Sequence, residues 1–216
     1  HYTVAIDPWL KGNPLCPEAE QTPKKLDLIV LTHGHSDHAS DVVRLHKETK
    51  CKVACTFELC VILQKEGVSG ESLVYMNKGG TVDIDSIKVT LTNAFHSSSY
   101  DTAEGKTLYA GEPCGVVIRS GKNSIYHAGD TLLFSDMKLI KDLYSPDVAF
   151  LPIGDRFTMG PKEAAIAAKL IGAKINLPLH YDTFPLLSGK ASDFEEECRK
   201  LEMVVQVLKP GESVSI

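Results

Sequence analysis

Two kinds of hydrophobic pattern alternate along this chain. Short apolar runs bounded by polar or glycine residues predict strands. Longer stretches with apolar positions every three or four residues predict helices. The expected strands are 4–6, 26–32, 52–55, 72–77, 81–84, 87–94, 115–119, 124–127, 147–151, 174–177, 204–208 and 213–216, and the expected helices are 40–49, 57–66, 136–143, 162–171 and a last one that begins near residue 192.

The order of these elements predicts the fold class. Strands with interspersed helices come first, and units of strand, helix and parallel strand follow, which favours an α/β protein with two sheet layers and helices outside them. The Ser/Gly-rich segment 97–111 is expected to be a loop. A chain of 216 residues is long enough for one large domain and short for two, so we expect a single domain over 1–216.

Composition narrows the class of protein. The chain is 43% hydrophobic and 24% charged, which is ordinary for a globular protein. Its formal net charge of −5 and its lack of a Lys/Arg cluster argue against a nucleic-acid partner. No apolar run approaches the roughly 18 residues of a membrane span, so no membrane partner is expected. Cys51, Cys55 and Cys60 fit no strong zinc spacing, and buried reduced thiols in a cytoplasmic protein are the expectation.

The segment after the apolar run 26–30 carries most of the chemistry. It places His33, His35, Asp37 and His38 within six residues. Imidazole and carboxylate groups are ligands that suit zinc, manganese or iron. Side chains two residues apart in an extended segment point the same way, so His33 and His35 can share one metal. Asp37 and His38 follow a turn and can face a second metal.

Three further polar residues stand at or just after predicted strand ends. They are His96, Asp130 and His180. Loops held by a rigid sheet are where sites are built. A lone histidine at such a place is more often a structural residue than a ligand. Together with the motif at 33–38, however, these three residues favour a reaction centre.

These residues resemble the signature of a known superfamily. His33-x-His35-x-Asp37-His38, followed by His96, Asp130 and His180, is similar to the ligand motifs of the metallo-β-lactamase superfamily. The wider match resembles one branch of it, the metal-dependent hydrolases related to L-ascorbate-6-phosphate lactonase. The segments that carry this match are Ile6-Asp7-Pro8-Trp9-Leu10, Asn93-Ala94-Phe95-His96-Ser97-Ser98-Ser99, His127-Ala128-Gly129-Asp130-Thr131, Leu151-Pro152-Ile153-Gly154-Asp155, Phe157-Thr158-Met159-Gly160-Pro161 and His180-Tyr181-Asp182-Thr183-Phe184-Pro185.

The resemblance implies a fold and a set of residue roles. The fold is a four-layered αββα sandwich. Members of this branch usually begin with a further strand, and because this chain starts at His1-Tyr2-Thr3, we expect that strand either to have been lost from the sequence or to be lacking in the protein. Two divalent ions, zinc or manganese, are implied. The first metal would be bound by His33, His35 and His96; the second by Asp37, His38 and His180; and Asp130 would bridge both. Asp7 would orient a ligand histidine, and Asp37 and Asp130 are the residues implied to act in catalysis.

The resemblance also implies an activity. It favours a metal-dependent hydrolase in which a hydroxide activated by two metals attacks a small ester, a lactone or a phosphorylated metabolite. A phosphodiesterase is the alternative. A di-iron oxidoreductase is less favoured, because such members of the fold carry glutamate where this chain has His35. A non-catalytic metal-binding module is disfavoured by the intact ligand set. Tyr181 and Asp155 are candidates for the general acid. Homo-oligomers are common in this branch, although the sequence itself gives no oligomeric state.

Overall fold

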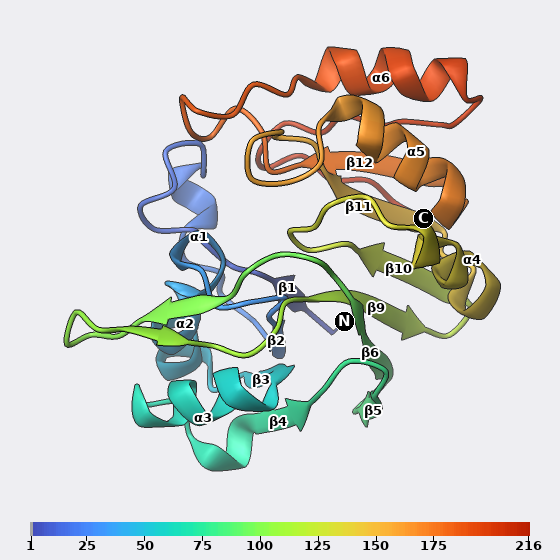
Figure 1. Ribbon diagram of the computed structural model, residues 1–216. Helices are drawn as coiled ribbons and strands as arrows, with labels where there is room; N and C mark the ends of the chain where they lie inside the picture. Colours follow the sequence, from blue (N-terminus) through green and yellow to red (C-terminus); the bar gives the residue numbers. More distant parts are fainter. Residues whose placement is uncertain (1) are drawn as a thin grey trace.

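The computed structural model describes residues 2–216, and His1 lies outside the described part. Its strands form two main sheets that face each other (Figure 1). The first sheet is parallel, in the order β1 (Val4–Ile6), β2 (Leu28–Val30), β3 (Lys52–Thr56) and β4 (Leu73–Met76). The second is mixed, in the order β12 (Ile175–Leu179), β11 (Val148–Pro152), β10 (Asn123–His127), β9 (Cys114–Ser120), β6 (Ile87–Asn93) and β5 (Thr81–Ile84).

Helices cover the outer face of each sheet (Figure 1). The first sheet is covered by α1 (Ser36–Ala39), α2 (Val42–Thr49) and α3 (Phe57–Lys65). The second sheet is covered by α4 (Lys138–Tyr144), α5 (Pro161–Ile171) and α6 (Ala191–Lys200). The expected four layers, helix, sheet, sheet and helix, are therefore confirmed.

Three hydrophobic cores fill the spaces between these layers. One joins the first sheet to its helices, a second joins the other sheet to α4, α5 and α6, and a third lies between the sheets. In the third core Leu28 and Val30 meet Leu91 and Val116, all fully buried. β2 has apolar side chains on both faces because it is covered on both. The loops that follow these strands are therefore anchored to a rigid core.

The cysteines agree with the expectation from the sequence. All six are free thiols, and Cys51, Cys55 and Cys60 are buried in the first core. No helix within residues 2–216 combines the length and the apolar character that a membrane crossing needs.

The expected loop at 97–111 is wrong. It contains the hairpin β7 (Ser99–Asp101) and β8 (Thr107–Tyr109), in which Ser99 pairs with Tyr109. The strands are three residues long, and of their side chains only that of Tyr100 is buried. Such short strands carry no readable alternation of polar and apolar positions.

The expected strands at 204–208 and 213–216 are also wrong. The first makes a single bridge, between Val205 and Asn176 of β12, and the second forms no strand. The backbone N–H of Asn176 donates to Val204, and that of Gln206 donates to Asn176. The next donor along β12 would be Pro178, which has no N–H, so the ladder stops there.

Candidate metal centre

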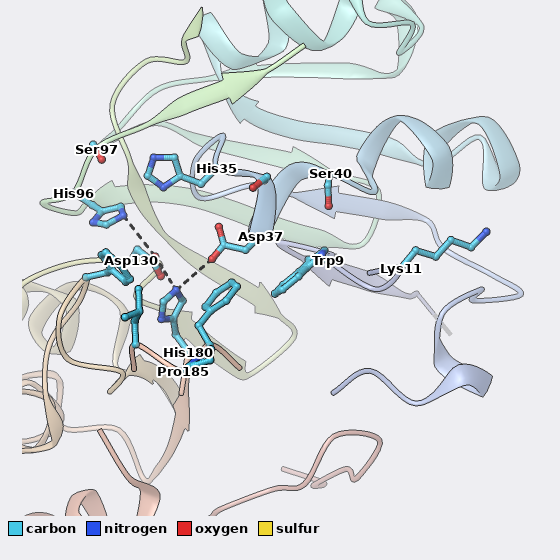
Figure 2. Close-up of a pocket in the computed structure, with 14 residues that line it drawn as sticks. Trp9, Lys11, His35, Asp37, Ser40, His96, Ser97, Asp130, His180 and Pro185 are labelled. Carbon is cyan, nitrogen blue, oxygen red and sulfur yellow. Dashed lines mark ion pairs between the residues drawn. The ribbon is translucent and has the colours of Figure 1, made fainter. Parts of the chain in front are cut away.

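The seven predicted ligands all come together at one edge of the two sheets, where β2, β6, β10 and β12 end. His33 and His35 follow β2, and Asp37 and His38 form part of α1. The other three follow strands of the second sheet: His96 comes after β6, Asp130 after β10 and His180 after β12. Figure 2 shows Asp37, His96, Asp130 and His180 gathered at one end of a cleft.

Their side chains form two groups that could each hold a cation. His33, His35 and His96 make one group, and Asp37, His38 and His180 make the other. These are the same triplets that the resemblance implies. The ligand roles themselves stay a prediction. A further group of Asp7, His33 and His38 is also close enough, but both oxygens of Asp7 already accept hydrogen bonds from protein groups.

Asp130 lies between the two groups. Its Oδ2 is 3.9 Å from His33 Nε2 and 3.6 Å from His96 Nε2 on one side. It is 3.4 Å from His38 Nε2 and 3.3 Å from His180 Nε2 on the other. One carboxylate oxygen therefore stands near ligand atoms of both groups, which is the position of a bridging ligand.

These spacings fit shared cations better than hydrogen bonds. His38 Nε2 is buried and has no hydrogen-bond partner, although it faces Asp130 and stands 3.6 Å from Asp37 Oδ2. Two ligand atoms that are each about 2.1 Å from a tetrahedral ion are about 3.4 Å apart. Buried polar atoms normally find a partner. The residues therefore fit a pair of divalent ions.

Asp7 holds two of the histidines in one orientation. Its Oδ2 accepts a hydrogen bond from His38 Nδ1 at 2.8 Å and another from Thr32 Oγ1 at 2.5 Å. The Thr32 hydroxyl in turn accepts from His33 Nδ1 at 2.9 Å. Both imidazoles thus carry their proton on Nδ1 and leave Nε2 for the cluster. The expected orienting role of Asp7 agrees with these contacts.

Electrostatics in the cluster depend on burial and on the carboxylates. Burial lowers the pKa of His33 to about 3, and the charge on His38 adds to that effect. Burial also opposes the charge on His38, but Asp130 and Asp7 outweigh it, and the pKa of His38 rises well above its usual value. Burial would raise the pKa of Asp130, yet His38 and His180 hold it well below its usual range. Asp130 is therefore an anion suited to cations.

The cleft beside the cluster has a volume of about 740 Å³. Sequence reasoning missed most of its wall, because single aromatic residues in loops give no pattern. The lining residues are Trp9, Lys11, His35, Ser36, Asp37, Ser40, His96, Ser97, Asp130, Phe157, His180, Phe184, Pro185 and Leu186.

The candidates for the general acid do not lie in this cleft. Tyr181 packs against the core under the second sheet. Asp155 accepts a hydrogen bond from Ser188 Oγ at 2.9 Å and stands outside the lining. Both residues are close to site residues in the sequence. The backbone turns at these points, however, since Asp155 and His180, which precedes Tyr181, both have positive φ.

Comparison with known proteins identifies the family. Residues 2–181 match the model of the beta-lactamase superfamily domain. The chain belongs to the metallo-β-lactamase superfamily. A UPF0173 metal-dependent hydrolase from Rubrobacter xylanophilus is 46% identical over 214 residues, which are 98% of this chain and 88% of that protein. The chain is therefore a member of the UPF0173 metal-dependent hydrolases.

Solved structures agree with this assignment. A metallo hydrolase from the archaeon Ignicoccus hospitalis has a TM-score of 0.85 and 35% identity, covering 98% of this chain and 89% of that one. A diiron β-hydroxylase from Streptomyces venezuelae has a TM-score of 0.70 at 15% identity, covering 96% of this chain and 49% of that one. At that low identity the second likeness concerns the fold alone.

Proposed function

We propose that this protein is a hydrolase that cleaves small esters or lactones at a centre of two metal ions. The bridging position of Asp130 between the two ligand groups is the observation that supports this most directly. When bound, two such ions supply a hydroxide at neutral pH and polarise the group under attack. Zinc and manganese are the ions that this ligand set suits best.

The chain's own residues have separate tasks in this proposal. His33, His35 and His96 would hold one ion, Asp37, His38 and His180 would hold the other, and the two ions would share Asp130. Asp37 is half-buried at the floor of the cleft, and its Oδ2 is 3.5 Å from His180 Nε2. In this proposal Asp37 both binds an ion and accepts a hydrogen bond from the attacking water.

The ligand set also bears on the alternatives. Five imidazoles and two carboxylates, with histidine at position 35, favour hydrolysis over di-iron redox chemistry. Phosphorylated metabolites and phosphodiesters stay as competing substrates, since a two-metal centre acts on phosphoryl groups as well as on carbonyl groups. An appropriate panel therefore includes all of these.

The test is turnover by metal-loaded protein of a panel of esters, lactones, phosphomonoesters and bis(p-nitrophenyl) phosphate. We expect ester or lactone turnover, and a loss of at least about 100-fold in kcat/KM for Asp37→Ala. Asp136→Ala removes an exposed carboxylate from the short 3-10 helix before α4, outside the cleft lining; it serves as the matched control and should retain full activity. Cleavage of the phosphodiester alone would replace this proposal with the phosphodiesterase.

A further inference from the structure

One wall of the cleft is apolar, and it begins right beside the metal centre. Trp9 and Phe184 stack with their ring centroids 5.6 Å apart and their planes 13° apart. Phe157 and Leu186 extend this wall, although their side chains are 49% and 53% exposed. Single exposed apolar residues are common on proteins. Four large ones that line one concave surface next to a reaction centre indicate a binding surface.

The loop that carries Trp9 is held in place from below. The backbone N–H groups of Leu10 and Lys11 both donate to Asp41 Oδ2, at 2.7 and 2.8 Å. Asp41 is itself buried and paired with Arg44 Nε at 2.7 Å. The backbone next to Trp9 is therefore fixed in position.

The loop that carries Phe184 is fixed in a similar way. The N–H groups of Ser188 and Gly189 donate to the carbonyl oxygen of Gly154. A Cβ at Gly189 would overlap the carbonyl oxygen of Ile153, so glycine permits this close approach. Ser188 Oγ also donates to Asp155, two residues before Phe157. The apolar wall is thus assembled before any ligand binds, which lowers the entropic cost of binding.

The distribution of charge in the cleft disfavours a phosphorylated substrate. Among the described residues that line it, Lys11 is the sole lysine or arginine. In Figure 2 Trp9 lies between the metal-binding cluster and Lys11, which stands at the far end. The guanidinium of Arg156, close by in sequence, stacks on the ring of Phe157 at 5.6 Å and does not line the cleft. A phosphate group on the bound substrate would find no basic side chain beside the centre.

We infer that the cleft selects an uncharged ester or lactone whose acyl or aryl group packs against Trp9 and Phe184, in preference to a phosphorylated metabolite. This inference rests on the proposed function. The reaction is addition of water across the acyl C–O bond: the acyl carbon gains the hydroxyl group, and the leaving oxygen gains the proton. Trp9 and Phe184 are specificity-determining residues in this scheme and take no part in the bond changes.

The test is a series of p-nitrophenyl esters from acetate to octanoate, with kcat/KM corrected for the alkaline hydrolysis rate of each ester. Each buried methylene should raise kcat/KM about threefold to fourfold until the wall is covered. An ester whose acyl chain ends in a phosphate should react more slowly than the uncharged ester of the same length. Trp9→Ala and Phe184→Ala should flatten the dependence of kcat/KM on chain length, whereas Trp9→Phe should retain the slope.

A second aromatic pair provides the control. Phe57 and Tyr75 also contact each other, with centroids 5.4 Å apart, but they lie on α3 and β4 outside the cleft. Phe57→Ala should therefore leave the slope unchanged. Equal loss of activity at every chain length in Trp9→Ala and Phe184→Ala would overturn the inference, and so would a flat dependence in the wild type that still cleaves acetate. Absence of turnover for every ester by the metal-loaded protein would instead overturn the proposed function.

Discussion

Asp7 binds His38 through a 2.8 Å hydrogen bond to Nδ1, so that only Nε2 of this histidine faces the metal-binding cluster. Asp7 itself has φ +48, a backbone conformation that few residues other than Gly, Asn and Asp adopt readily. Its backbone N–H also donates to Val30 at the end of β2. The first strand thus carries a residue that orders the loop after the second.

Asp7→Asn should weaken metal binding while leaving the backbone in place, because asparagine tolerates positive φ but carries no negative charge to hold the imidazole proton. Loss of such an orienting carboxylate typically costs 10–100-fold in metal affinity, and we expect about this loss here. Competition with a chromogenic chelator measures it. Asp83→Asn, which removes an exposed carboxylate paired with Lys88, is the control. Equal affinities in the two variants would refute the orienting role.

Thr32→Val should weaken binding of the ion at the His33 group more than binding of the ion at the His38 group. Valine keeps the shape of threonine but lacks the hydroxyl that links Asp7 to His33 Nδ1. In a double-mutant cycle with Asp7→Asn, the effects on metal affinity should be clearly less than additive, since both changes break the same chain of hydrogen bonds. Additive effects would mean that Thr32 acts independently of Asp7.

Metal binding should release protons near neutral pH. In the protein stripped of metal, burial opposes the charged form of both His38 and His180. Asp130 and Asp7 outweigh burial and raise the pKa of His38 well above 6.5, and Asp37 and Asp130 together outweigh it and raise the pKa of His180. A cation needs the neutral imidazole, so the proton must leave. Metal affinity should rise with pH until the pH passes these raised pKa values and should then level off.

The same shift fixes the sign of a stability effect. A pKa that is higher in the folded state means that protonated His38 stabilises the stripped protein below pH 6.5, and that this contribution is lost as the pH rises through the raised value.

Calorimetry of metal binding at pH 7, in two buffers of different ionisation enthalpy, counts the protons that are released when the metal binds. A binding enthalpy that is the same in both buffers would show that none is released.

Gly189→Ala should destabilise the protein by about 1–3 kcal/mol, the usual range for an added atom in a packed site. The new Cβ would meet the carbonyl oxygen of Ile153, which has no room to move because Ile153 is fully buried. Gly105→Ala meets no neighbour, and its φ of +78 alone should cost about 1 kcal/mol. Chemical unfolding compares the two variants. A smaller loss of unfolding free energy in Gly189→Ala than in Gly105→Ala would mean that the loop carrying Phe184 is not tightly held.

The sequence was sufficient to predict the layers of helices and sheets and the residues of the metal-binding cluster. β2, β6 and β10 each end three residues before a predicted ligand, so both the strands and the expected ligands could be read together. The strand expected at 204–208 failed because Pro178, in a different segment, stops the ladder on which it would have paired.

The cleft wall could not be predicted for a related reason. Trp9 and Phe184 are 175 positions apart, and their stacking depends on how Asp41 and Gly154 fix two loops. The relay from Asp7 through Thr32 to His33 was likewise hidden, since a threonine before a histidine has no special pattern. Long-range contacts of this kind follow from the packed fold and not from local periodicity.

The central claim is that one chain holds two divalent ions at the edge where strands of both sheets end. Elemental analysis of the purified protein by mass spectrometry tests this claim most directly. After saturation with zinc or manganese and removal of the excess, we expect two ions per chain in the wild type. His33→Ala should lose metal and turnover together, because this histidine supplies Nε2 within 3.9 Å of Asp130 Oδ2. One ion or none per wild-type chain, or a His33→Ala variant with both ions and full activity, would contradict the account.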